Sequence, residues 1–198
     1  FSASGALAAP TNGSSALDRL EDLSDDDIGM LASAFKSHLA RFPSWESSAQ
    51  TEQTRDHTAQ LAAFFERLKG VRRFDGDVVK GKGSRARVAR DMERVLWFLE
   101  NDLARGILVK AQLDWDSHYR NADKQAGANG AFFQYFAHFL SELHKRKNAY
   151  GTLAEQTVIV LGSELGRFPV LNGNLGKDHF PETGLLFFGP GINTNDGK

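Results

Sequence analysis

Cysteine is absent from this 198-residue chain. Disulfide bonds and thiolate metal ligands are therefore excluded, whereas the redox compartment stays open. No apolar run approaches the roughly 20 residues needed to span a bilayer, so the sequence predicts no membrane span. A charge excess of one sign is also missing, because the formal net charge is −1. The sequence thus predicts no general attraction to nucleic acid or to anionic lipid.

Neither an initiator methionine nor a signal-peptide pattern is seen. The chain begins with Phe1, and no positively charged segment precedes an apolar core near this end. A start at Phe1 suggests a processed or shortened chain. Hydrophobic residues do make up 41% of the chain, and a domain of this size buries roughly 70% of its unfolded surface. We therefore expect a hydrophobic core.

Residues 1–104 are predicted to be mainly helical. In the first helix, Ser24 and Asp27 form a variant of the capping box, and Pro43 ends the helix. Two further helices are expected over residues 54–69 and 85–104. The apolar residues at helical spacing are Ile28, Leu31, Phe35, Leu39 and Phe42 in the first helix, Leu61, Phe64, Phe65 and Leu68 in the second, and Val88, Met92, Val95, Leu96, Leu99 and Leu103 in the third.

Residues 105–198 alternate between strand and helix patterns. Strands are expected over residues 107–113, 157–164 and 184–191, and a helix over residues 128–146. The apolar residues at helical spacing in this helix are Phe132, Phe136, Phe139, Leu140 and Leu143. The second strand is apolar throughout, which is typical of a strand covered on both faces. We predict an α/β fold with a parallel sheet flanked by helices. The helical region packs on this sheet, and the two regions form one compact domain.

Three chemically active side chains follow the first predicted strand. Asp114, Asp116 and His118 occupy every second position. In an extended chain, side chains two residues apart point the same way, so these groups would emerge on one face. Carboxylate oxygen and imidazole nitrogen both suit zinc and manganese. The alternative is that strand ends are solvent-exposed and commonly rich in aspartate.

Further candidates follow the second predicted strand and a later loop. Glu164 stands at the end of an apolar strand, where a charge needs a partner, and an ion pair with Arg167 is the structural alternative to a metal-binding role. Asp178 and His179 lie in a loop rich in glycine and asparagine, where isolated side chains are commonly solvated. Ligands of parallel sheets bind beyond the carboxyl ends of the strands. The side chains that follow the first and second predicted strands are expected at this position.

The remaining histidines and the basic segment predict no site. The other four histidines fit helix surfaces without a ligand role: His38, His57, His138 and His144. The basic residues within 69–90 are diluted by Asp75 and Asp77 and have no aromatic ladder, so a solvated loop is favoured over a polyanion site. The sequence GKGSR also lacks the spacing of a phosphate-binding P-loop. Nucleic acid is therefore not an expected partner.

Three short motifs in order resemble one protein family. They are Trp115-Asp116-Ser117-His118, Ser163-Glu164-Leu165-Gly166-Arg167 and Gly176-Lys177-Asp178-His179. They are similar to the Trp-Asp-Thr-His, Ser-Glu-Phe-Gly-Arg and Gly-Arg-Asp-His motifs of the bacterial domain-of-unknown-function family 1501. Its members are usually exported and are assigned to the alkaline phosphatase and sulfatase superfamily. The resemblance covers about residues 85–198, with Ser117, Leu165 and Lys177 as departures.

The resemblance implies a metal site and an alkaline phosphatase-like fold. The superfamily holds two metal ions at the carboxyl ends of a parallel sheet, so one or two zinc or manganese ions are implied here. By position, the implied ligands are Asp116, His118, Glu164 and His179, with Asp178 as a fifth candidate. Asp114 departs from the glycine common in the family, yet it has a spacing to His118 that is used elsewhere in the superfamily. The choice between Asp114 and Asp116 stays open, and Arg167 is implied to contact a phosphate or sulfate oxygen bidentately.

The implied function is metal-dependent hydrolysis of small phosphate or sulfate esters in a periplasmic or exported protein. In the superfamily, the nucleophile and a further ligand lie near the first strand, before these motifs. Nothing in residues 1–105 resembles such a strand, so the chain is expected to be the C-terminal part of a longer enzyme, or a reduced relative, and to be inactive alone. The alternative is a non-catalytic binding or structural protein that keeps the fold without the nucleophile.

Overall fold

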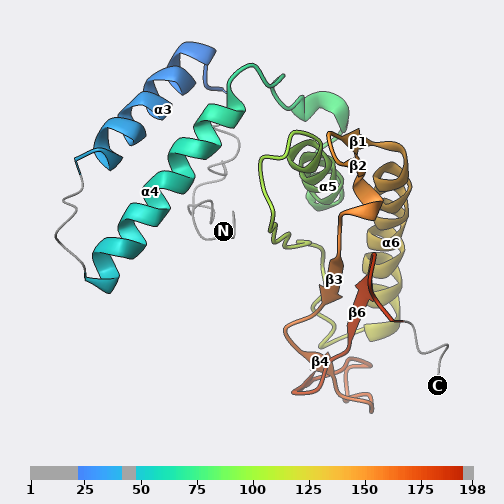
Figure 1. Ribbon diagram of the computed structural model, residues 1–198. Helices are drawn as coiled ribbons and strands as arrows, with labels where there is room; N and C mark the ends of the chain where they lie inside the picture. Colours follow the sequence, from blue (N-terminus) through green and yellow to red (C-terminus); the bar gives the residue numbers. More distant parts are fainter. Residues whose placement is uncertain (1–21, 42–47, 194–198) are drawn as a thin grey trace. The chain divides into compact units, whose positions relative to one another are not determined.

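The computed structural model describes residues 22–41 and 48–193 (Figure 1). Its residues form two compact units, one within 1–75 and 97–108 and the other within 76–96 and 109–198. The boundary passes through helix α5, Ser84–Glu100. No helix in the described ranges has the length and apolar character needed to cross a membrane.

The first unit contains the helix pair α3, Asp25–Leu39, and α4, Ala49–Leu68. The predicted capping box is confirmed, because Ser24 Oγ accepts from Asp27 N at 3.1 Å and Asp27 Oδ2 accepts from Ser24 N at 3.0 Å. Helix α3 ends at Leu39, and Pro43 lies outside the described residues. The core that holds this unit together consists of Ile28, Ala32, Phe65, Leu68, Phe98, Leu103 and Ala104.

The second unit is built on helix α6, Asn121–Lys145, which starts seven residues before the predicted position 128. Its buried aromatic stripe matches the predicted one, and Phe136 stacks between Phe132 and Phe139. Phe136 also meets Phe188 edge-on, with ring centroids 5.4 Å apart. Further short elements of this unit are η1 Gly76–Val78, β1 Lys147–Asn148, β2 Gly151–Thr152 and η2 Leu153–Glu155.

A buried carboxylate joins α6 to the part of α5 that belongs to the same unit. Glu93 is 8% exposed. Its oxygens contact Arg146 Nη2 at 2.6 Å and His138 Nε2 at 3.1 Å. Such a charge is costly to bury alone, and the guanidinium and imidazole together compensate it. His138 is therefore a structural partner of Glu93.

The predicted parallel sheet is wrong. The described strands form three separate two-stranded antiparallel pairs, β1–β2, β3–β6 and β4–β5. Strand β3, Ile159–Gly162, and β6, Leu185–Phe188, do share a sheet, as predicted. They run antiparallel because no helix lies between them in the chain, and a parallel connection needs a long crossover. The described structure is mostly helical, and the α/β fold class is not supported.

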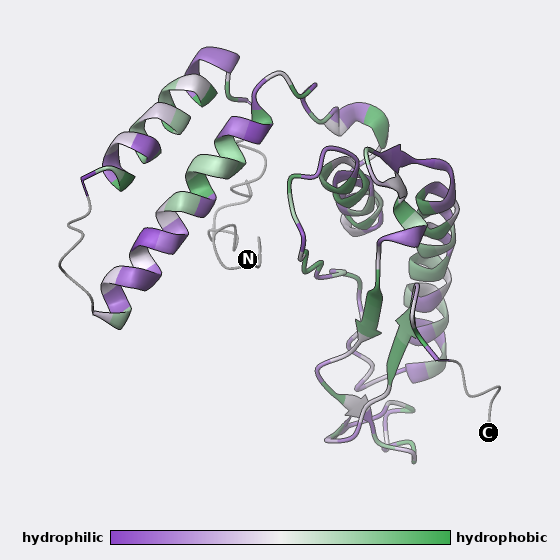
Figure 2. Cartoon of the chain, viewed as in Figure 1, coloured by the Kyte–Doolittle hydropathy of each residue, from purple (hydrophilic) through white to green (hydrophobic). Residues whose placement is uncertain are grey.

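The expectation that residues 157–164 form a strand covered on both faces is also wrong. Figure 2 shows β3 and β6 as strongly hydrophobic. Nevertheless, Val160 is 56% exposed and its cross-strand partner Phe187 is 51% exposed. Only one face of the pair packs inward, where Phe188 reaches the aromatic stripe of α6. A continuous apolar run therefore did not indicate two covered faces here.

The predicted strand over residues 107–113 does not form. After an isolated bridge at Gly106, residues 107–120 have no regular secondary structure. The backbone forms local hydrogen bonds instead, from Leu113 N to Ala111 O and from Trp115 N to Leu113 O. The indole of Trp115 adds a further local hydrogen bond by donating to Ala111 O at 2.7 Å. Without this strand there is no strand–helix–strand unit, which removes the basis for the parallel sheet.

The aromatic stripe of α6 predicts a large difference between two neighbouring phenylalanines. Phe136 is 6% exposed and Phe133 is 47% exposed. Phe136→Ala should lower the free energy of unfolding by about 3–5 kcal/mol because it leaves a cavity in the core. Phe133→Ala, the matched control on the outer side, should change it by roughly 0.5 kcal/mol. Urea denaturation followed by circular dichroism measures both, and equal losses would contradict the assigned core.

Candidate functional site

The three motifs found in the sequence meet in the second unit. Strand β4 is Gly166–Arg167, strand β5 is His179–Phe180, and their register places Arg167 directly opposite His179. Directly opposed residues of an antiparallel pair present their side chains on the same face. The segment 115–118 lies against this pair, because Arg167 reaches both Trp115 O and Asp116. Residues far apart in the sequence are thus brought to one place.

His118 and His179 form the centre of the candidate site. Their ring centroids are 4.7 Å apart and the rings are tilted by 53°. Asp116 Oδ1 contacts His118 Nδ1 and also accepts from the main-chain N of His118 at 3.2 Å. Ser117, between them, is fully buried, so the two polar side chains lie on the exposed side of the segment. The predicted same-face arrangement therefore holds for Asp116 and His118.

The position of the proton on His118 follows from its neighbours. Arg167 Nη1 lies 3.4 Å from His118 Nδ1 and could donate only to an unprotonated nitrogen. The closer contact with Asp116 requires a proton on Nδ1. We favour the Asp116 bond, since an ionised acceptor at short range outweighs a long contact. In the neutral ring, this leaves Nε2 of His118 as the nitrogen with a free electron pair.

Arg167 fastens the motifs to one another. Its guanidinium donates to Lys177 O at 3.2 Å and to Trp115 O at 3.3 Å, and it lies 3.4 Å from Asp116 Oδ1. The side chain is 19% exposed. The ion pair considered in the sequence, Arg167 with Glu164, is replaced by this pair with Asp116. The anion-binding role of Arg167 stays a prediction, and its observed role is structural.

Two glycines allow the backbones to approach. A Cβ on Gly176 would lie 1.9 Å from His118 O, and a Cβ on Gly166 would lie 1.9 Å from Glu182 O. Neither position accepts a side chain without displacing backbone. At the first of these contacts, Lys177 N donates to Ser117 O at 2.8 Å. The glycines of the second and third motifs therefore permit the close packing that brings the histidines together.

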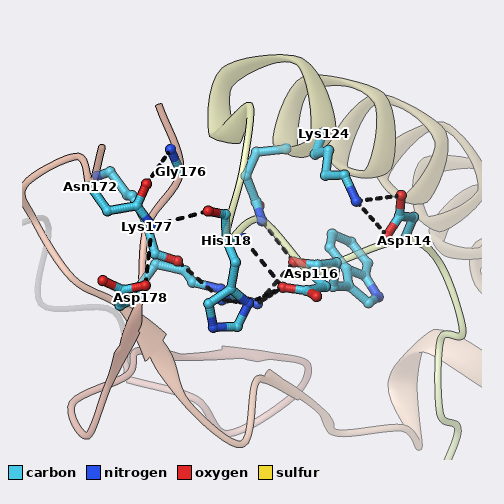
Figure 3. Close-up of polar contacts among 11 residues, drawn as sticks. Asp114, Asp116, His118, Lys124, Asn172, Gly176, Lys177 and Asp178 are labelled. Carbon is cyan, nitrogen blue, oxygen red and sulfur yellow. Dashed lines mark hydrogen bonds and ion pairs between the residues drawn. The ribbon is translucent and has the colours of Figure 1, made fainter. Parts of the chain in front are cut away.

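The other three predicted ligands are directed elsewhere. Asp114 pairs with Lys124 of α6 at 3.0 Å, and Asp178 accepts from Asn172 Nδ2 at 3.1 Å (Figure 3). Glu164 is exposed in the bend between β3 and β4. Asp114 separates from Asp116 because residues 107–120 form no strand that would hold both side chains on one face. Tyr119 and Asp114 raise the pKa of Lys124, which keeps this ammonium charged beside the Asp114 carboxylate.

The described residues do not complete a metal site. No three histidine, aspartate or glutamate side chains within them are grouped closely enough to hold an ion. The donor chemistry is suitable, since two neighbouring imidazoles and a carboxylate are typical ligands of zinc. Structural and catalytic zinc sites use at least three protein ligands, and these three side chains do not converge closely enough to hold an ion. The cluster of Asp116, His118 and His179 is thus at most part of a metal site.

Sequence reasoning missed two residues that hold the site. Trp115 packs edge-on against Phe132 of α6 with ring centroids 5.9 Å apart, and its carbonyl accepts from Gln125 Nε2 and from Arg167. Asn172 donates to both His118 O and Asp178. A signal for Asn172 was present, because asparagine before glycine and asparagine is typical of a turn closed by its own side chain. Trp115 gave no signal beyond its place in the motif.

The environment of Asp116 favours its charged form. The hydrogen bond from the His118 side chain, then the one from the His118 main chain, and the nearby charge of Arg167 lower the pKa of this carboxyl. A lowered pKa in the folded chain adds stability that is present above the pKa of the unfolded chain. That stability is lost as the pH falls through the lowered value. Since Asp116 is 60% exposed, solvent screening keeps the contribution small.

This electrostatic arrangement predicts a measurable titration. In an NMR titration of carboxyl carbons, Asp116 should show a pKa below the value of about 3.9 of a free aspartate. His118→Gln removes the largest cause of the shift and should raise that pKa toward the free value. His144→Gln, at the far end of α6, is the control and should leave it unchanged. An Asp116 pKa that does not respond to His118→Gln would contradict the assigned hydrogen bond.

Comparison with known proteins concerns the region that contains the three motifs. No curated protein and no solved structure matched the chain significantly. Residues 83–195 match the family described as "Protein of unknown function (DUF1501)". The match covers more than half of the chain, includes all three motifs, and agrees with the resemblance found in the sequence. The chain therefore belongs to the DUF1501 family.

Proposed function

We propose that this chain forms the C-terminal part of a metal-dependent hydrolase of phosphate or sulfate esters. In this proposal Asp116, His118 and His179 are its share of the metal ligands, and zinc or manganese is the metal. The observation that carries the proposal is the meeting of the three motifs, with the two imidazoles 4.7 Å apart. The backbone approaches at Gly166 and Gly176 support it, because they bring these side chains together at the protein surface.

The chemistry of the cluster supports a cation rather than a purely structural role. Both histidine rings lie at the surface, and His118 is 42% exposed. A packing role would favour burial, whereas neutral imidazoles with accessible nitrogens suit zinc and manganese. The contact of Asp116 with His118 Nδ1 has the form of the carboxylate–histidine pairs that orient metal-binding rings. Asp116 thus supports the proposal either as a ligand or as the group that orients His118.

The proposal requires groups beyond this cluster. A further ligand is needed, because the described residues contain no group of three histidine, aspartate or glutamate side chains that could hold an ion. A nucleophile is needed as well. Asp114 and Asp178 are held by Lys124 and Asn172, so each would have to leave its present partner to bind an ion. We propose that the missing groups come from another segment of the complete protein. The bound metal would supply Lewis-acid stabilisation of the ester oxygens.

A second function is favoured by one observation. Asp116, His118 and His179 do not converge closely enough to hold an ion, and the donors of Arg167 are directed to Trp115 O, Lys177 O and Asp116. A protein that keeps this arrangement purely for structure would look the same. The alternative proposal is therefore a non-catalytic binding or structural protein. The two proposals differ in whether the histidine pair responds to metal.

Zinc titration tests the leading proposal. Zinc should bind the complete protein, which includes the segment that supplies the missing ligand, and should raise its melting temperature, because a ligand of the native state stabilises it by about 2.7 kcal/mol when free zinc exceeds Kd a hundredfold. His118→Ala should remove most of this gain, since it deletes a nitrogen donor of the pair. His144→Ala should keep the gain, because His144 lies in the last turn of α6. Calorimetric titration and thermal unfolding provide the two measurements.

Two outcomes would change the conclusion. An absence of any zinc or manganese effect on the complete protein would move the assignment to the non-catalytic protein. Rapid metal-dependent hydrolysis of an aryl phosphate or sulfate by this chain alone would show that the nucleophile lies within it. The proposal expects negligible hydrolysis by the isolated chain.

A further inference from the structure

Asn172 uses its whole amide group at the edge of the candidate site. Its Nδ2 donates to His118 O at 3.0 Å and to Asp178 Oδ1 at 3.1 Å (Figure 3). Its Oδ1 accepts from Asn174 N at 3.0 Å and from Gly176 N at 2.9 Å. One side chain therefore makes four hydrogen bonds, two within its own loop and two to the segments that carry the histidines.

The loop closed by Asn172 is also fixed by its main chain. Asn172 N donates to Gly176 O at 2.9 Å, and Leu175 N donates to Asn172 O at 3.1 Å. Beyond the loop, Asn121 N at the start of α6 donates to Leu175 O at 2.9 Å. The loop is thus a compact unit seated between α6 and the segment that ends in His118. A shift of this loop would move His179, which follows it by three residues after Gly176.

A simple turn residue would not need this arrangement. An asparagine that only closes a turn uses its Oδ1 on a main-chain N–H two residues ahead, and here Asn174 N supplies that bond. The Nδ2 bonds are additional. One of them reaches His118, which is 54 positions away in the sequence. They join the first motif to the third, and no local turn requires that connection.

We propose that Asn172 is a positioning residue that sets the placement of His118 against His179 and holds the Asp178 carboxylate away from them. The two Nδ2 bonds fix the main chain of His118 relative to the residue that precedes His179. The purpose of this placement rests on the proposed function. The placement itself exists without metal, so it can be tested separately.

Asn172→Asp is the sharpest substitution. It keeps the shape and the Oδ1 acceptor, but it replaces the Nδ2 donor by a carboxylate oxygen that faces His118 O and the Asp178 carboxylate. His118 O and the Asp178 carboxylate are both hydrogen-bond acceptors, and the Asp178 carboxylate also carries the same charge as the new group. Both therefore repel the new carboxylate oxygen. Asn174→Asp adds the same charge in the same loop and serves as the matched control. Its contact with Asn172 uses only the main-chain N, which the substitution retains.

The metal-free readout is the nuclear Overhauser effect between the ring protons of His118 and His179. It should be present in the unaltered chain and in Asn174→Asp, and it should fall below detection in Asn172→Asp. Asp178→Ala removes one of the two Nδ2 bonds and should give an intermediate loss. The ring signals of His138, which contacts Glu93, should not move and report that the fold is kept. If Asn172→Asp does not fold, the Overhauser effect in Asp178→Ala tests the positioning role.

The zinc readout separates this inference from the proposed function. Where the complete protein binds zinc, Asn172→Asp should weaken binding roughly tenfold or more, as expected for residues that orient ligands. If the complete protein binds no zinc but the Overhauser effect is lost in Asn172→Asp, the proposed function is wrong and the positioning role stands. If the effect keeps its full intensity in Asn172→Asp, or in Asp178→Ala where the former does not fold, the positioning role is wrong.

Discussion

The arrangement of the site depends on the contact between two backbones. The loop before His179 lies so close to the segment of His118 that Gly176 has no room for a Cβ beside His118 O. The bond from Lys177 N to Ser117 O closes this contact at 2.8 Å. This contact brings together the two segments that carry the imidazoles.

Charge reinforces this contact. Arg167 carries its guanidinium among the carbonyls of Trp115 and Lys177 and beside Asp116. One cation thus satisfies acceptors from two segments and lowers the pKa of the carboxyl, after the larger effect of His118. At 19% exposure, its hydrogen bonds are partly shielded from water and are stronger than at an open surface. The same residue that was expected to bind an anion instead holds the motifs in register.

The second unit separates a packed side from a polar one. Helix α6 buries its aromatic stripe on Phe188 of β6 and on Trp115. Trp115 is the first residue of the first motif, and Asp116 follows it in the chain. Packing of α6 therefore supports the segment from which the site residues project. The exposed side chains of Val160, Leu185 and Phe187 lie on the opposite face of the strand pair, where the described residues provide no cover.

The sequence by itself determined the local features. The capping box at Ser24 and the aromatic stripe of α6 arise from neighbours within a few residues, so periodicity and caps were sufficient to predict them. The three motifs likewise indicated the family. Tertiary structure alone decided the rest, because strand pairing and site geometry depend on partners far apart in the chain. It turned residues 107–120 into an irregular segment, paired β3 with β6 antiparallel, and directed Asp114 to Lys124 while Asp116 met His118.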